Sequence, residues 1–220
     1  YRSPRLKHEG VQMTINEHCA DKEIIQLFIT EITQDWHQFS EQVGVFELRC
    51  LAKNRTPITQ IFTLDAVGEA VDLAVRMNAT KLNVYMTINP INPNSIRVGK
   101  GATDNDILRA HYSFADADDQ QGLDGLIRLS TSQPPDINVI TGTVPHERRH
   151  AYWRLVEPCH DLSLWESKQA QIAAHARTDS AVTNSSRIMR VPGTISYPEA
   201  TKQSKGYVQE FVTMIVRADQ

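Results

Sequence analysis

ILRAHYSFADAD, residues 107–118, is the segment from which the fold of this chain is best predicted. Its first ten residues are rich in apolar and aromatic side chains and are typical of a strand. The strand leads into Asp116-Ala117-Asp118. Alternate strand residues point to one face about 6.5–7 Å apart, so the two aspartates share a face while Ala117 points to the packed side. Two such carboxylates can bind a pair of divalent cations, the arrangement that in-line nucleotidyl transfer requires.

This acidic segment has two other interpretations. Asp119 follows directly, so the segment could be a solvated acidic turn. A calcium-binding EF-hand loop requires Gly at its sixth position and Glu at its twelfth. Counted from Asp116, those positions hold Gln121 and Ile127, which excludes the EF-hand.

The segments on either side of this strand indicate an α+β fold. Apolar spacing predicts a helix capped by Asp21 and helices over 65–77, 123–129 and 162–176. Strands are predicted over 43–51, 81–88, 137–140, 151–156, 187–191 and 207–216. Without strict βαβ alternation, we expect a mixed or antiparallel sheet with flanking helices on one face. Residues 1–20 are polar and are predicted to be an irregular tail, which leaves one domain over 21–220.

The composition is that of an ordinary globular protein. The 220 residues include 23 basic and 26 acidic side chains, for a net charge of −3, which excludes a protein that coats nucleic acid through bulk charge. No apolar run approaches the roughly 20 residues that cross a bilayer, so no membrane association is expected. Three separated cysteines, Cys19, Cys50 and Cys159, indicate buried thiols in a reducing cytoplasm.

Residues 146–150, HERRH, match the signature of zinc metalloproteases. The signature requires a helix, on which histidines four apart share one face and bind one zinc. Here Pro145 precedes the motif, Thr141-Gly142 lies just upstream, and residues 151–156 resemble a strand. We therefore expect an accidental match and keep the zinc protease as an alternative.

Arginines gather in RIMRVPGT, residues 187–194, beside the turn at Pro192-Gly193. Guanidinium groups match the geometry of phosphate oxygens, so this segment is a candidate phosphate site. Arg148, Arg149 and Arg154 could extend the basic patch. The alternative is an ordinary surface strand and turn.

Taken in chain order, these segments resemble the RepB-type primase domains of plasmids and phages, within the archaeo-eukaryotic primase superfamily. The resemblance runs from VFELR at 45–49 and NVYMTINP at 83–90 to HYSFADAD at 111–118, which resembles the first catalytic motif. ITGTVPHERRHAYWRLVEP at 140–158 resembles the segment with the second motif. RIMRVPGTISYP at 187–198 and KGYVQEFV at 205–212 resemble the closing segment.

The resemblance implies a palm similar to the RNA-recognition motif, with Mg²⁺ or Mn²⁺ as cofactor and nucleoside triphosphates as substrates. By the family pattern, Asp116, Asp118 and Asp179 would bind the metals. His150 would be the second-motif histidine that contacts the triphosphate. The family's Ser-x-His is not present, and Arg149 and His150 occupy its place.

The resemblance also implies the remaining site and the partners. Arg187 and Arg190, with Arg149 or His150, would bind the triphosphate, and single-stranded template DNA would lie across the sheet face. Residues 21–220 would then be a primase-polymerase catalytic domain that makes primers in plasmid or phage replication, with a replicative helicase, in the same chain or another one, as a further partner. The second alternative is a catalytically silent module that binds single strands or an origin.

Overall fold

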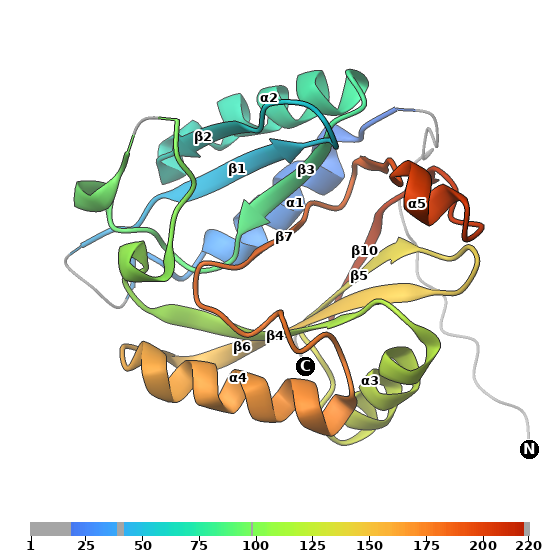
Figure 1. Ribbon diagram of the computed structural model, residues 1–220. Coiled ribbons are helices and arrows are strands. Elements are labelled where there is room, and N and C mark those ends of the chain that lie inside the picture. The colour runs from blue at the N-terminus through green and yellow to red at the C-terminus, as the bar shows by residue number, and fades with distance from the viewer. Residues whose placement is uncertain (1–18, 39–41, 98, 218–220) are drawn as a thin grey trace, which may run out of the picture.

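A computed structural model describes residues 19–38, 42–97 and 99–217 (Figure 1). Within these ranges, two four-stranded antiparallel sheets form the centre of the molecule. The first sheet has the order β2 (Ile58–Phe62), β1 (Phe46–Leu51), β3 (Asn83–Thr87), β7 (Ile188–Arg190). The second has the order β10 (Thr213–Val216), β5 (Ile137–Gly142), β6 (Arg148–Cys159), β4 (Ala110–Ala117).

Helices flank the outer sides of the two sheets (Figure 1). Helix α2 (Val67–Ala79) packs on β1 and β3, whereas α3 (Gln120–Ser132) and α4 (Leu162–Ala176) pack on β4. The C-terminal part adds a two-stranded sheet, β8 (Ile195–Ser196) with β9 (Glu210–Phe211), and the short helix α5 (Ala200–Gln203) between them. Three 3₁₀ turns cover Leu64–Ala66, Pro93–Ser95 and Asp104–Asp106.

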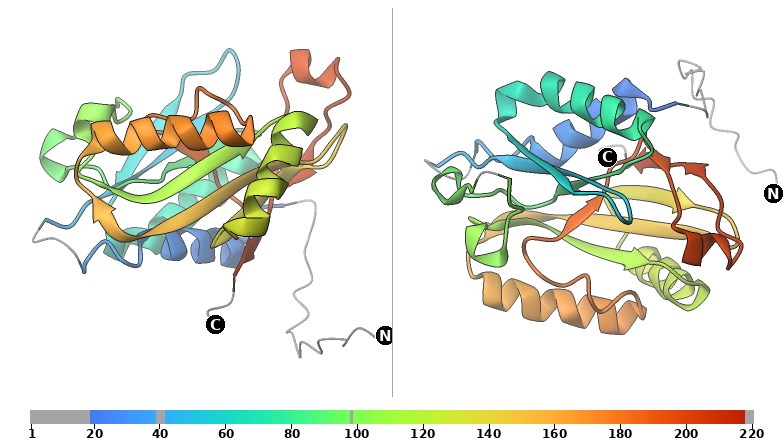
Figure 2. Two further views of the ribbon diagram at one scale, coloured as in Figure 1. Left: turned by 90° about the horizontal axis from the view of Figure 1, so that it is seen from below. Right: turned by 45° about the horizontal axis from the view of Figure 1, so that its top comes forward.

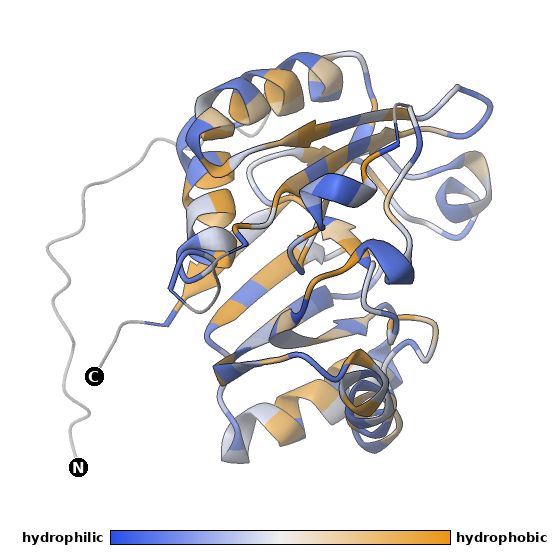
Figure 3. Cartoon of the chain, turned by 90° about the vertical axis from the view of Figure 1, so that its left-hand side faces the viewer, coloured by the Kyte–Doolittle hydropathy of each residue, from blue (hydrophilic) through white to orange (hydrophobic). Residues whose placement is uncertain are grey.

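Helix α1 (Lys22–Thr33) connects the two sheets. It begins at Asp21, whose Oδ1 accepts hydrogen bonds from Glu23 N (2.9 Å) and Ile24 N (3.1 Å), as an N-cap should. Its apolar face is buried, and Phe28 meets Tyr152 of β6 edge-to-face, with ring centroids 5.9 Å apart. Hydrophobic and hydrophilic residues alternate along the helices and strands (Figure 3), as expected for elements with one buried side.

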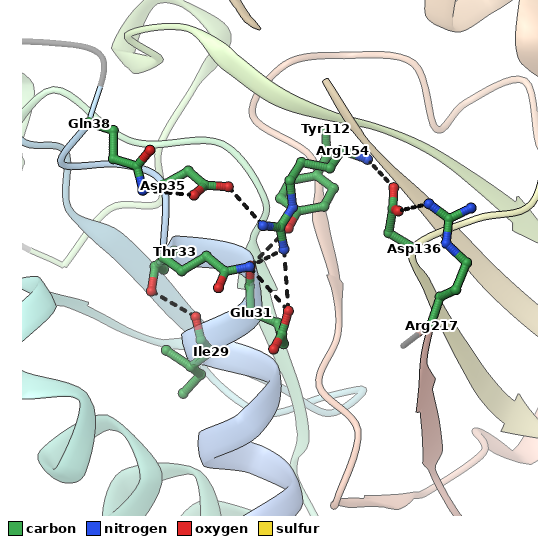
Figure 4. Close-up of polar contacts among 10 residues, drawn as sticks. Ile29, Glu31, Thr33, Asp35, Gln38, Tyr112, Asp136, Arg154 and Arg217 are labelled. Carbon is green, nitrogen blue, oxygen red and sulfur yellow. Dashed lines mark hydrogen bonds and ion pairs between the residues drawn. The ribbon is translucent and has the colours of Figure 1, made fainter. Parts of the chain in front are cut away.

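An ionic network links α1 to the second sheet (Figure 4). The Arg154 guanidinium of β6 lies 3.2 Å from a Glu31 oxygen and 2.9 Å from an Asp35 oxygen. The Tyr112 hydroxyl of β4 donates to the Glu31 carbonyl at 2.8 Å. Helix α1 also packs on α2, which covers the first sheet. The contacts of α1 therefore fix one sheet relative to the other.

The end of β4 is held by close packing of α3 against α4. A Cβ added at Gly125 of α3 would lie 1.7 Å from the Ala176 carbonyl oxygen, so only glycine allows this approach. Helix α3 begins immediately after the strand, where Asp119 Oδ1 accepts a hydrogen bond from Gly122 N at 2.7 Å. The short connection keeps Asp118 at the strand end.

The α+β prediction is confirmed, with antiparallel strands and flanking helices, but the strands form two large sheets instead of one. The predicted helices and most of the strands are present. Strand β2 and helix α5 were missed, and the predicted strand over 207–216 is broken into β9 and β10. Residues 1–18 of the predicted tail lie outside the described residues.

Two smaller expectations concern the cysteines and the membrane. Cys50 is buried as predicted, whereas Cys19 is exposed and Cys159 only partly buried, so the prediction of three buried thiols was wrong. Across the described ranges, no helix has the length and apolar character needed to span a bilayer.

Candidate active site

Strands β4 and β6 bring the first predicted acid and the predicted histidine face to face. In their antiparallel register Asp116 lies opposite His150, and Asp116 Oδ1 is 3.6 Å from His150 Nε2. Both side chains are largely buried, with 17% of Asp116 and 7% of His150 exposed. Asp118 follows the strand and is half-exposed. The alternation predicted from the sequence therefore places both aspartates at one cavity, described below.

Burial, and then the negative charges of Asp118 and Asp179, raise the pKa of Asp116 to about 8. Asp116 Oδ1 also has no hydrogen-bond partner among the described residues. A buried carboxyl with an unpartnered oxygen is costly to ionise unless a cation approaches it. Asp116 is therefore protonated at neutral pH when no cation is bound.

His150 is neutral at neutral pH. Burial, and then the positive charge of Arg190, lower the pKa of His150 to about 3. Its Nδ1 lies 3.2 Å from the Tyr152 hydroxyl, within hydrogen-bond distance. With both Asp116 and His150 uncharged, their 3.6 Å contact is not an ion pair. The imidazole is thus available to hydrogen-bond a ligand in the cavity.

Across the cavity, the first sheet contributes Arg190 of β7. Its guanidinium donates to Asn83 Oδ1 (2.5 Å) and to the Tyr85 hydroxyl (2.9 Å), both on the neighbouring strand β3. It also lies 4.9 Å from the centroid of the Tyr85 ring. All of these partners are neutral, so the positive charge of Arg190 is oriented but not compensated.

These side chains line a cavity of about 360 Å³ between the two sheets. Its walls combine residues of β3, β4, β6 and β7 with the segment around α5. A second, more open pocket of about 600 Å³ adjoins it and shares Asn83, Tyr197 and Tyr207 with it. Lys53 and Lys81 line this second pocket.

Lys202 of α5 lines the cavity, although no sequence pattern predicted it there. Its Nζ lies 3.4 Å from Asp118 Oδ2. Figure 2 shows the C-terminal segment (red) beside the β5–β6 hairpin (yellow) in both views. No local pattern joins residues 84 positions apart, so only the folded structure could reveal this contact.

Arg148 was predicted only as part of a broader basic patch, yet it is buried at the cavity wall. It forms an ion pair with Glu210 at 2.7 Å and lies 4.6 Å from the Tyr207 ring centroid. A Cβ at Gly142 would overlap this pair, lying 1.7 Å from an Arg148 nitrogen. Strand alternation was the available signal, because Arg148 and His150 are two residues apart and share a face.

Two predicted site residues lie elsewhere. Arg149 is between Arg148 and His150 on β6, so it points to the opposite face, where it pairs with Glu147. Arg187 precedes β7 and donates to the Ala181 carbonyl oxygen. Neither side chain lines the cavity.

Asp179 is near the first carboxylate but is oriented differently. Its backbone N–H donates to the Asp116 carbonyl oxygen at 2.9 Å, and its charge contributes to the raised pKa of Asp116. Its own carboxylate accepts from Ala181 N at 2.9 Å and is not part of the cavity wall. The proposed role of Asp179 as a metal ligand stays a prediction.

The HERRH segment is not helical, which contradicts the zinc-protease alternative. His146 and Glu147 lie in the turn before β6, and His150 is within the strand. The ring of His146 contacts the Asp118 carbonyl oxygen at 2.9 Å, whereas His150 faces Asp116. Zinc would require both imidazoles on one helix face, so the match is accidental.

The carboxylates fit a divalent cation of the Mg²⁺ type. The described residues bring no three potential ligands (His, Cys, Asp or Glu) together into a ready-made metal site. Mg²⁺, however, commonly binds through one or two carboxylates plus substrate phosphates and water. Asp116, with its unpartnered buried oxygen, and the half-exposed Asp118 supply two such ligands.

Three solved structures are similar to this chain. The archaeo-eukaryotic primase domain of the cyanophage S-2L primase-polymerase has a TM-score of 0.61 at 18% identity, over 90% of each chain. Primase RepB' has a TM-score of 0.53 at 14% identity, over 86% of this chain and 56% of that one. The catalytic domain of RepB' in complex with initiator DNA gives 0.53 and 14%, over 90% and 85%.

Comparisons with protein-family models and with curated proteins give no match. The structural similarity to the first of these structures extends over 90% of this chain. The chain has the fold of these archaeo-eukaryotic primase domains.

Proposed function

We propose that this chain is a primase-type nucleotidyltransferase, which joins nucleotides on a single-stranded DNA template with Mg²⁺ or Mn²⁺. The observation that supports this most strongly is the cavity between the sheets. One wall carries the buried, unpartnered carboxyl of Asp116, and the other carries the uncompensated guanidinium of Arg190. A nucleoside triphosphate with its cation has the charges that match these two walls.

Asp116 and Asp118 would hold the metal, and Asp179, which lies beside Asp116, would be the third ligand. When bound, the metal would supply Lewis-acid stabilisation of the phosphoryl oxygens and a lowered pKa for the attacking 3′-hydroxyl. Arg190 orients the triphosphate through its guanidinium. The neutral imidazole of His150 hydrogen-bonds a phosphate oxygen, since its protonated form is disfavoured by burial and by Arg190.

The nucleic acid strand would occupy the open pocket that adjoins the cavity. Tyr197 and Tyr207 offer aromatic surfaces there, and Lys53 and Lys81 offer positive charge. Replacing both lysines with alanine should reduce the salt dependence of single-strand binding by about 1.4 in the slope of log K against log salt. Lys168→Ala on α4, at a distance from this pocket, is the control. An unchanged slope in the double variant would place the strand elsewhere.

The proposal is tested by incubating the protein with single-stranded DNA, labelled nucleotides and Mg²⁺ or Mn²⁺. We expect oligonucleotides that disappear when the template is omitted or the metal is chelated. Parallel reactions with ribo- and deoxyribonucleotides determine which substrate is preferred. A protein that binds single strands but makes no oligonucleotides under any of these conditions would be the silent binding module instead, which holds single strands or an origin for a helicase partner.

A further inference from the structure

Lys202 lies in an unusual position for a cation in this cavity, because its ion-pair partner is a proposed metal ligand. Its Nζ is 3.4 Å from Asp118 Oδ2 and 5.4 Å from the centroid of the Tyr207 ring. The side chains of Lys202 and Asp118 are each 50% exposed. Ion pairs with this exposure contribute little to stability, so the contact can be exchanged at small cost.

Lys202 lies on a long loop, residues 197–209, which connects β8 to β9. These two strands pair with each other. At its beginning, Asn83 of the first sheet accepts from Tyr197 N (2.8 Å) and donates to the Tyr197 carbonyl oxygen (2.9 Å). Within it, Tyr207 N donates to the Lys202 carbonyl oxygen at 3.2 Å.

Glu210, directly after this loop, fixes its C-terminal end to the second sheet. Its carboxylate accepts from Thr143 N (2.5 Å), from the Thr143 hydroxyl (2.7 Å) and from the buried Arg148 (2.7 Å). Arg148 also packs on Tyr207, which lies next to Lys202. The backbone that carries Lys202 is therefore anchored to both sheets, while its ammonium group is only weakly held.

The other cations of the cavity are held in fixed positions, Arg190 by neutral hydrogen-bond acceptors and Arg148 by a carboxylate. Arg190 is bound to Asn83 and Tyr85, and Arg148 is paired with Glu210. A metal at Asp118 would take the oxygen that Lys202 now contacts, and would leave the ammonium group beside the phosphates that accompany the metal. We infer that Lys202 exchanges partners: it pairs with Asp118 in the empty cavity and with the triphosphate of the bound nucleotide.

This inference rests on the proposed function and assigns a substrate-binding role to Lys202. It predicts effects of opposite sign for Lys202→Ala. Without nucleotide, loss of the competing ammonium group should tighten Mn²⁺ binding about two- to fivefold, the range expected for an exposed ion pair. With Mn²⁺ present, affinity for a nucleoside triphosphate with a non-hydrolysable α–β linkage should fall about tenfold, since a charged hydrogen bond is lost.

Both affinities can be measured without turnover, the first by electron paramagnetic resonance of free Mn²⁺ and the second by calorimetry. Lys202→Arg should keep nucleotide affinity within about threefold of wild type, because it keeps the charge. Lys205→Ala is the matched control, because Lys205 lies on the same loop but does not line the cavity. It should change neither affinity, and circular dichroism should show all variants folded.

Unchanged Mn²⁺ affinity in Lys202→Ala, or a loss of affinity for both ligands, would overturn the exchange. These outcomes are distinct from failure of the proposed function, which would appear as absence of oligonucleotide synthesis by the wild-type protein. A wild type that makes primers while Lys202→Ala binds both ligands normally would leave the function standing and remove only this role of Lys202.

Discussion

The second sheet gives the cavity its acidic and imidazole side chains, whereas the first sheet gives it a guanidinium. Asp116 and His150 come from β4 and β6, and Arg190 comes from β7 with its neutral supports on β3. The second sheet also contributes Arg148, but Glu210 compensates its charge. The uncompensated positive charge is thus on one side of the cavity and the acids are on the other.

This difference indicates that the two sheets have different functions. A metal belongs with the second sheet, where carboxylates offer oxygens, and the phosphate tail belongs with the first, where a fixed guanidinium offers donors. Substitutions in the two sheets should therefore have different kinetic signatures. The second sheet should control the rate of the chemical step, and the first should control the affinity for nucleotide.

Loss of a carboxylate should have the largest effect. Asp116→Ala or Asp118→Ala removes a proposed metal ligand, which is expected to reduce oligonucleotide synthesis about 1,000-fold or more, equivalent to several kcal/mol. The fold should remain intact, as circular dichroism can verify. Asp124→Ala on the exposed side of α3 is the control. Near-normal synthesis by either cavity variant would show that these acids do not hold the metal.

His150→Ala should have the next largest effect, a loss of at least about tenfold in kcat/KM, or roughly 1.4 kcal/mol of transition-state stabilisation. Its neighbours provide an internal control, because Arg149, His146 and Glu147 do not line the cavity. Arg149→Ala, His146→Ala and Glu147→Gln should each retain most of the activity. A large loss of activity in Arg149→Ala with a small loss in His150→Ala would mean that Arg149, and not His150, contacts the nucleotide.

Arg190→Ala should act mainly on binding of the nucleotide. We expect KM for nucleotide to rise about tenfold while kcat changes less than about twofold, since the guanidinium contacts the triphosphate in the ground state and in the transition state. Arg187→Ala, three residues earlier but outside the cavity, should leave KM unchanged. If Arg190→Ala weakens template binding instead, the guanidinium belongs to the nucleic acid path.

A further effect, on stability and not on activity, depends on pH. Burial raises the pKa of Asp116 to about 8 in the folded chain from an ordinary value of 3.8, so unfolding releases a proton between these values. The contribution of Asp116 to stability therefore decreases as pH rises from about 4 to 8. In chelator, Asp116→Asn should be about 1–3 kcal/mol more stable than wild type at pH 7 and equal to it near pH 4.

Urea denaturation at both pH values measures this difference. Asp124→Asn should show no such gain at pH 7. Added Mn²⁺ should reverse the order at pH 7 by stabilising the wild type more than Asp116→Asn, because only the carboxylate provides an anionic ligand. Equal stabilities at pH 7 in chelator would contradict the raised pKa.

The sequence predicted best what depends on neighbouring residues. The apolar run of residues 107–116 predicted β4, which contains Asp116 and ends next to Asp118. The cap at Asp21 and the periodic apolar face predicted α1. Arg149 was a candidate because the family's Ser-x-His is absent and Arg149 and His150 occupy its place. The predicted strand began at residue 151, whereas β6 begins at Arg148. With the correct start, alternation would have favoured Arg148 and His150 over Arg149.

Long-range contacts could not be predicted in this way. Lys202 meets Asp118 only because the chain returns from β8 to β9, which are themselves strands of two residues each. The division into two sheets was equally hidden, since strand pairing joins segments far apart, such as β3 with β7. These contacts depend on tertiary packing, which local periodicity does not encode.

The central claim is that the two sheets bind one nucleotide together, the second through the metal and the first through the phosphates. A crystal structure with Mn²⁺ and a non-hydrolysable nucleoside triphosphate tests it most directly. We predict anomalous density for Mn²⁺ between Asp116 and Asp118, with the triphosphate extending from it to Arg190. Mn²⁺ bound away from these carboxylates, or a nucleotide that contacts only one sheet, would contradict the account.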